Sequence, residues 1–122
     1  MSNTEVVLTF INAWNTENWD AVCDAFADNI VYHNIPMEKI EGKVAADAFI
    51  RGMGVSNVDW EVLAIAEAGN RVLTERIDRM DMPNGKRIEL PLMGIFEVED
   101  GKITAWRDYF HFDAAYWGVE GT

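Results

Sequence analysis

TERIDRMDMPNGKRIELPLMGIFEVEDGKITAWRDYF, residues 74–110, alternates apolar with polar side chains along most of its length. A period of two is typical of β-strands that bury one face. The alternation breaks at Asn84-Gly85 and Asp100-Gly101, dipeptides that favour tight hairpin turns, and Gly69-Asn70 forms a similar break upstream. The pattern therefore predicts an antiparallel meander of four strands, near residues 58–67, 71–81, 86–98 and 102–112.

The residues before position 58 have helical periodicity instead. A first helix, capped by Asn3 or Thr4, carries apolar residues at the spacing of one helix face: Val6, Val7, Phe10, Ile11 and Trp14. A second helix is expected from near Asn18 to residues 27–29, and a third over residues 44–53, with the β-rich run IVYHNIP between them. Helices followed by strands predict an α+β fold, with an apolar pocket between a curved sheet and the helices.

The composition of the chain indicates how many domains it forms and which partners it can bind. Its 122 residues, 49% of them hydrophobic, suit one core and include no linker-like tract, so we expect a single domain over residues 1–122. The formal net charge of −11 would repel polyphosphates and anionic lipid headgroups, which argues against nucleic acid as a partner. No basic leader and no long apolar run is present, so we expect a cytoplasmic protein that does not span a membrane.

Cysteine and histidine residues offer little chemistry in this chain. Cys23 is the only cysteine, and its apolar surroundings in the sequence favour a buried thiol over a nucleophile. His33 and His111 lie far apart and have no partner at metal-ligand spacing. We therefore expect no metal site.

Charged side chains within the predicted strands are the most informative polar residues. Arg76 and Asp78 share a strand face with apolar neighbours, and so does Asp108, while Tyr32 and Asn34 share a face in the upstream run. One interpretation is a structural ion pair between Arg76 and one aspartate, with the other aspartate at the surface. The other is a functional cluster, because two carboxylates beside one guanidinium, with a phenol and a carboxamide, can hold a water molecule and exchange protons.

Three motifs decide between families: YHNIP at residues 32–36, TERID at residues 74–78 and LMGIFEVEDGKITAWRDYF at residues 92–110. In this order and at these separations they resemble the limonene-1,2-epoxide hydrolase family, a branch of the NTF2-like and SnoaL-like folds. The resemblance extends from about Phe10 to Phe112. It implies an NTF2-like cone, in which a curved mixed sheet wraps over N-terminal helices and encloses a deep apolar pocket. It also implies an enzyme that adds water to a small apolar epoxide, terpene-like, cyclic or aryl, to give a vicinal diol without a cofactor or a covalent intermediate.

The resemblance also implies roles for individual residues. Asp108 resembles a general base that takes a proton from a water molecule held by Tyr32 and Asn34. Asp78 resembles a general acid that protonates the epoxide oxygen as the ring opens, with Arg76 bridging the two carboxylates. A homodimer is expected on the same grounds, with the outer face of the sheet as the contact.

Six apolar residues resemble the substrate-binding lining of the family: Phe49, Met53, Met80, Leu90, Leu92 and Phe110. Strand alternation independently places Leu90 and Leu92 on one face. For each of the six, ordinary core packing remains an alternative. Trp14 and Trp60 are expected to be core residues.

Two other functions remain open for this fold. A ketosteroid-isomerase-like enzyme needs a carboxylate near the end of the first strand and a phenol in the first helix, where this chain has Asn34 and Phe10. A non-catalytic NTF2-like module that binds small molecules needs only the pocket and the sheet. Such a module has little use for buried charges, so the charged cluster favours the hydrolase.

Overall fold

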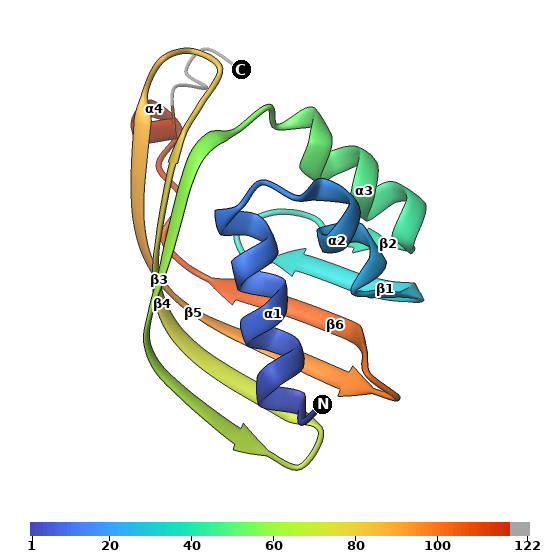
Figure 1. Ribbon diagram of the computed structural model, residues 1–122. Coiled ribbons are helices and arrows are strands. Elements are labelled where there is room, and N and C mark those ends of the chain that lie inside the picture. Colours follow the sequence, from blue (N-terminus) through green and yellow to red (C-terminus); the bar gives the residue numbers. More distant parts are fainter. Residues whose placement is uncertain (118–122) are drawn as a thin grey trace.

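The computed structural model describes residues 1–117 and has an α+β architecture, with helices against one face of a curved sheet (Figure 1). The domain predicted from the sequence extends to residue 122, and residues 118–122 lie outside the described range. Six strands form one mixed sheet in the order β2-β1-β6-β5-β4-β3, which curves without closing into a barrel. The predicted α+β class and the curved mixed sheet over N-terminal helices are confirmed.

The helices are α1 (Asn3–Asn15), α2 (Trp19–Asp24), α3 (Lys43–Gly52) and α4 (Ala114–Trp117), and the strands are β1 (Phe26–Asn34), β2 (Ile40–Glu41), β3 (Ser56–Ala68), β4 (Arg71–Asp81), β5 (Arg87–Glu99) and β6 (Lys102–Tyr109). Figure 1 shows α1 lying across the concave face of the long strands, with α2 and α3 near β1 and β2. Among residues 1–117, no helix has the length and apolar character needed to cross a membrane.

The last four strands form the predicted antiparallel meander. Asp100 and Gly101 make the β5–β6 turn with φ angles of 50° and 75°, and a type I′ hairpin requires this left-handed region at both positions. The strand bounds lie close to the predicted ones except in β6, which ends at Tyr109 rather than near residue 112. Register shifts between Val62 and Ala64 in β3 and at the β5–β6 pair interrupt the ladders, and such bulges increase strand bending.

β1 lies parallel to β6, a pairing that joins distant parts of the chain. Tyr32 lies opposite Trp106, and Asn34 lies opposite Asp108. The pairing also explains why the second helix is shorter than predicted. α2 ends at Asp24 instead of at residues 27–29, because the N–H of Ile103 in β6 binds the carbonyl of residue 25 and the chain continues as a strand. The two-residue strand β2, which pairs with β1, has no counterpart in the sequence prediction.

The cap of α1 also differs from the prediction. Ser2 caps the helix, rather than Asn3 or Thr4. The Ser2 hydroxyl accepts a hydrogen bond from Glu5 N at 3.1 Å, and the Ser2 N–H donates to the Glu5 carboxylate at 3.0 Å. This reciprocal capping box satisfies two donors at once, which a cap one or two residues later would not do here.

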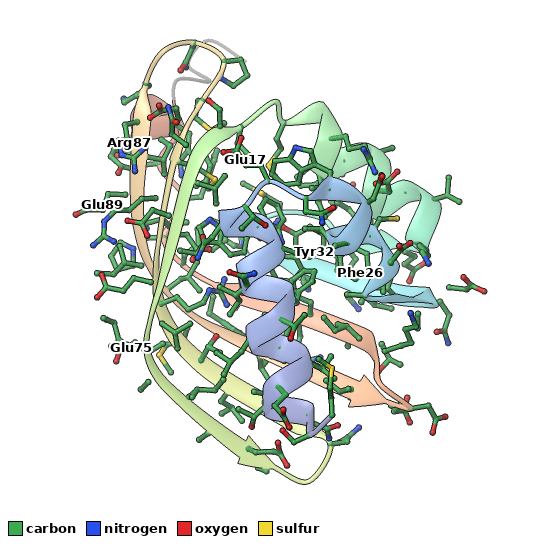
Figure 2. All side chains as sticks on the ribbon, viewed as in Figure 1. Glu17, Phe26, Tyr32, Glu75, Arg87 and Glu89 are labelled. Carbon is green, nitrogen blue, oxygen red and sulfur yellow. The ribbon has the colours of Figure 1, made fainter. Side chains whose placement is uncertain are left out.

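Aromatic side chains fill the space between α1 and the sheet. Trp106 on β6 is fully buried and stacks on Tyr32 and Phe96, with ring centroids 4.3 Å and 5.4 Å away. Phe10 of α1 meets Trp106 edge-on at 5.1 Å. Figure 2 shows Tyr32 in the interior, whereas Glu75 and Glu89 lie on the outer side of the sheet. The aromatic cluster fixes the two strands that carry Tyr32 and Asp108 relative to α1.

Candidate active site

A glycine on β5 makes room for a buried arginine. Across three neighbouring strands, Thr74 on β4 lies opposite Gly94 on β5, and Gly94 lies opposite Asp108 on β6. Because Gly94 has no side chain, the guanidinium of Arg76 can reach across β5 to Asp108. A Cβ atom at Gly94 would overlap the Asp108 carboxylate and lie 2.5 Å from Arg76 Nη1. Gly94 is not among the site residues predicted from the sequence.

Arg76 bridges both aspartates. Its Nε and Nη2 donate to Oδ1 and Oδ2 of Asp78 at 3.0 Å and 2.9 Å, which makes a bidentate pair. Nη2 also donates to Oδ2 of Asp108 at 3.0 Å, and Nη1 donates to Thr74 Oγ1 at 2.9 Å. The side chains of Arg76, Asp78 and Asp108 are 0%, 3% and 5% exposed. The interpretation in which Arg76 pairs with one aspartate while the other lies at the surface is therefore wrong.

The cluster holds one positive charge against two carboxyl groups. Burial disfavours the charge on Arg76, but Asp108 and Asp78 outweigh this effect and raise the pKa of Arg76 above its ordinary value. The guanidinium carbon also lies 5.2 Å from the ring centroid of Trp60 and 5.7 Å from that of Phe96, within the range of cation–π attraction. Arg76 is therefore a permanent cation, and a proton on one carboxyl group would make the buried cluster neutral.

Asp78 is the carboxyl group that burial disposes to carry this proton. Desolvation raises its pKa to about 6, the charge of Asp108 adds to the rise, and Arg76 acts in the opposite direction. Asp78 also borders the cavity described below. A carboxyl group that titrates near neutral pH beside a cavity can act as a general acid.

Asp108 receives hydrogen bonds on both carboxylate oxygens. Trp106 Nε1 donates to Oδ1 at 2.8 Å, and Arg76 donates to Oδ2. Asn34 lies opposite Asp108 in the β1–β6 register, and Tyr32 is its neighbour on the same face. Burial, together with the charge of Asp108, raises the pKa of Tyr32, so the phenol keeps its proton and can donate it in a hydrogen bond. The carboxylate is thus held in one orientation next to a phenol and a carboxamide.

A mostly apolar cavity lies against the cluster. It contains about 440 Å³ of space not filled by protein atoms, part of it open to solvent. The lining includes all six residues predicted for the pocket and four of the five polar ones, while Arg76 lies behind the aspartates. The lining residues are Trp14, Tyr32, Asn34, Met37, Phe49, Met53, Trp60, Asp78, Met80, Leu90, Leu92, Asp108, Phe110 and Trp117.

Residues 1–118 match the family model described as the limonene-1,2-epoxide hydrolase catalytic domain. The chain belongs to the limonene-1,2-epoxide hydrolase family. The match spans nearly the whole chain, so it includes the helices, the sheet and every polar residue of the cluster. The family resemblance drawn from the three motifs is thereby confirmed, and with it the assignment of the chain as an epoxide hydrolase.

Individual relatives support this family assignment. Epoxide hydrolase EphG of Mycobacterium tuberculosis is 37% identical over 105 residues, which cover 85% of this chain and 70% of that protein. A solved structure of an M. tuberculosis limonene-epoxide-hydrolase-like epoxide hydrolase has a TM-score of 0.81 at 35% identity, over 89% of this chain and 82% of the other. An NTF2-like protein of unknown function from Cytophaga hutchinsonii has a TM-score of 0.76 at 29% identity, over 97% and 96% of the two chains. The NTF2-like fold is confirmed.

Four lining residues are not among those predicted for the pocket: Trp14, Met37, Trp60 and Trp117. Trp14 and Trp60 were expected in the core, and their rings do stack there at 4.1 Å while they also border the cavity. Trp60 lies opposite Asp78 in the β3–β4 register, so strand pairing offers a signal for it. Met37 follows directly after the YHNIP motif, whereas the sequence holds no comparable signal for Trp117.

The two histidines lie apart from the cluster. His33 Nε2 lies 2.9 Å from the carbonyl oxygen of Met37, and His111 is exposed. In the part of the chain that the structure describes, no group of three or more His, Cys, Asp or Glu side chains is arranged to hold a metal ion.

Gly94→Ala is expected to lower kcat/KM of this epoxide hydrolase on the order of 10²-fold, because the new Cβ must displace Asp108 or Arg76 and small misplacements are costly in a preorganised site. Gly52→Ala is the matched control. A Cβ at Gly52 meets nothing within 4 Å, so that variant should keep normal activity. Epoxide hydrolysis and circular dichroism of both folded variants provide the test. A Gly94→Ala enzyme with unchanged kcat/KM would show that the close packing around Gly94 has no role in activity.

Proposed function

We propose that the chain adds water to a small apolar epoxide in a single step and releases a vicinal diol, without a cofactor and without a covalent intermediate. The observation that carries this proposal is the placement of two carboxyl groups, bridged by one buried arginine, at the wall of an apolar cavity. Both aspartates border the cavity, while Arg76 is shielded from it. The two groups can therefore act on the same substrate from neighbouring positions.

Asp108 is the proposed general base. It would accept a proton from a water molecule that also binds Tyr32 and Asn34, so that the water oxygen attacks one carbon of the epoxide ring. The hydrogen bonds from Trp106 and Arg76 hold the carboxylate in place during this transfer. The neighbouring phenol and carboxamide support this role because both can donate to a water oxygen.

Asp78 is the proposed general acid. It would give its proton to the epoxide oxygen as the carbon–oxygen bond breaks, so that no full alkoxide charge develops. After one turnover Asp108 has gained a proton and Asp78 has lost one. Arg76 contacts both carboxylates, so its charge stabilises the cluster before and after the reaction. One proton must then return from Asp108 to Asp78 to restore the starting state.

The cavity supports an apolar substrate. The residues proposed to bind it are Phe49, Met53, Met80, Leu90, Leu92 and Phe110. None of these side chains carries a formal charge, so substrate binding would rest on apolar burial, with the epoxide oxygen and the attacking water near the aspartates. This arrangement suits terpene-like, cyclic or aryl epoxides better than charged ones.

The activity is expected to decline as the pH rises above about 6. The acid role requires a proton on Asp78, which is present below the pKa of that group and lost above it, and burial raises this pKa to about 6. The measurement is kcat/KM from about pH 5 to 9, with thermal unfolding at each pH to show that the fold persists. A profile that is flat or rises between pH 6 and 9 would contradict Asp78 as the acid.

We also propose a homodimer that forms through the outer face of the sheet. Leu73 on β4 and Met93 on β5 are 37% and 51% exposed, and the alternation of each strand directs them away from the cavity. Burying such side chains against a second copy would remove apolar surface from water. Sedimentation equilibrium should give twice the chain mass of 13.8 kDa, and a single-chain mass at micromolar concentration would contradict the dimer.

The proposal is tested by incubating the purified protein with a panel of terpene, cyclic and aryl epoxides and measuring diol formation. Diol from at least one member, in excess of the uncatalysed reaction, is expected. Binding of these compounds without any turnover would instead favour the non-catalytic binding module. The isomerase alternative has no support at Phe10, which packs against Phe26, Phe96 and Trp106 and has no hydroxyl group.

A further inference from the structure

One edge of β5 is covered by a side chain instead of a strand. β5 spans Arg87–Glu99, but β6 pairs with it only from Met93 onward. Among residues 1–117, no strand pairs with the first part of β5 on that side. Backbone groups on such an edge need other partners.

Tyr116 supplies these partners. Its hydroxyl accepts a hydrogen bond from Glu89 N at 2.6 Å and donates one to Glu89 O at 2.8 Å. The phenol of Tyr116 thus makes the two hydrogen bonds to the Glu89 backbone that a neighbouring strand would otherwise make. Lys86 lies 5.3 Å from the ring centroid of Tyr116, within cation–π range. Figure 1 shows α4, which carries Tyr116, beside this part of the sheet.

Trp117, the next residue, contributes to the cavity wall. Its ring centroid lies 6.1 Å from that of Phe110 and 6.0 Å from that of Phe112, and Phe110 also lines the cavity. We call residues 110–117 the C-terminal strap. Among the described residues, the buried indole N–H of Trp117 has no hydrogen-bond partner, so the ring is held by packing. α4 has only four residues, and a helix of one turn is not stable alone. The hydrogen bonds of Tyr116 to Glu89 therefore attach the segment that carries Trp117 to β5.

The hydrogen bonds between Tyr116 and Glu89 lie close in the sheet to Asp78, the proposed general acid. Tyr116 binds the backbone of Glu89, and the next residue, Leu90, lines the cavity and lies opposite Asp78 in the β4–β5 register. A shift of the strap would therefore change the distance between Trp117 and the wall formed by Leu90 and Asp78. Trp117, Leu90 and Asp78 all line this cavity, so the distances among them affect how much space is left for a substrate beside Asp78.

We propose that Trp117 limits the size of the substrate and that the Tyr116 hydroxyl is the positioning group that holds Trp117 in the cavity wall. Trp117 is then a specificity-determining residue, and Tyr116 acts through it without touching the substrate. The role of Trp117 in limiting substrate size rests on the proposed epoxide hydrolysis. The role of Tyr116 as an anchor rests only on its hydrogen bonds to Glu89.

The test compares the wild type with Trp117→Ala, Tyr116→Phe and the control Tyr109→Phe, which removes a phenol hydroxyl from the exposed face of β6. The substrates are cyclohexene oxide, which is compact, and trans-stilbene oxide, which is long. Trp117→Ala should raise the ratio of kcat/KM for the long over the compact epoxide by about tenfold. Tyr116→Phe should raise it several-fold, and the control should not change it. An unchanged ratio in Trp117→Ala would overturn the size limit.

A second readout does not depend on catalysis. Amide hydrogen exchange at Glu89 should be faster in Tyr116→Phe than in the wild type and in Tyr109→Phe, because the hydroxyl that binds this N–H is gone. If the wild type forms no diol, the proposed function fails. The size limit is then tested by titrating the same variants with hydrobenzoin, the diol of stilbene oxide, which Trp117→Ala should bind about tenfold more tightly. Equal exchange at Glu89 in Tyr116→Phe and in the control would overturn the anchor.

Discussion

Replacing Asp108 with asparagine is expected to lower kcat for epoxide hydrolysis by about 10²- to 10⁴-fold while the protein stays folded. Asparagine has nearly the same shape and can still accept one hydrogen bond from Trp106 or Arg76, but it cannot take a proton from water. Asp78→Asn should cause a loss of similar size, because the amide cannot deliver a proton to the epoxide oxygen. Both variants therefore separate proton transfer from packing.

The measurement is steady-state hydrolysis of the best substrate, with thermal unfolding of each variant as the check on the fold. Asp20→Asn is the matched control, because the Asp20 side chain is 86% exposed, pairs with Arg51 and, like Arg51, does not line the cavity. It should leave kcat unchanged. An Asp108→Asn enzyme that retains near-normal kcat would remove this carboxylate from the role of base.

Arg76→Ala is expected to damage stability and activity together. It leaves two buried carboxyl groups close to each other without their shared countercharge, and loss of one partner from a buried ion pair typically costs about 3–5 kcal/mol of unfolding free energy. Activity should fall as well, because neither aspartate keeps its orientation. Arg76→Lys should be intermediate, since one ammonium group cannot make the bidentate contact with Asp78 and also reach Asp108 and Thr74.

Urea unfolding and kcat/KM of the same preparations measure both effects. Arg79→Ala is the control, because Arg79 also contacts three carboxylates, but on the outer side of the sheet, where water screens the charges. Its loss should change stability little and activity not at all. An Arg76→Ala protein as stable as the wild type would show that the buried cluster is not held together by this arginine.

Much of the site is predictable from the sequence because strands alternate strictly. The alternation places Arg76 and Asp78 on one face of β4, and it places Leu90 and Leu92 on one face of β5. The structure finds these four residues buried or nearly buried on the inner face, as the pattern requires. The turn dipeptides then fix the order of the four long strands, so a local pattern determines most of the sheet.

Other features depend on contacts that no local pattern reveals. The parallel pairing of β1 with β6 joins residues that are far apart in the chain, and it shortens α2 by converting the segment after Asp24 into a strand. Gly94 gains its importance only when Thr74 and Asp108 are known to flank it on neighbouring strands. The backbone conformation of Gly94 does not require glycine. A glycine is needed there because the side chains of Asp108 and Arg76 occupy the space that a Cβ atom would fill. Trp117 lines the cavity, and its neighbour Tyr116 binds the backbone of a distant strand; no local pattern in the sequence indicates either contact.

Direct attack by water is the central step of the proposed mechanism, and a single turnover in water enriched with oxygen-18 tests this step. Enzyme is used in excess over the epoxide, and the isotopic content of the first diol is measured by mass spectrometry. If Asp108 acts as a base, the first diol carries one labelled oxygen, because the attacking oxygen comes from solvent. If Asp108 or Asp78 attacks the ring and forms an ester, the first diol is unlabelled and the label appears in that carboxylate. We expect the labelled diol, and an unlabelled first diol would rule out direct attack by water.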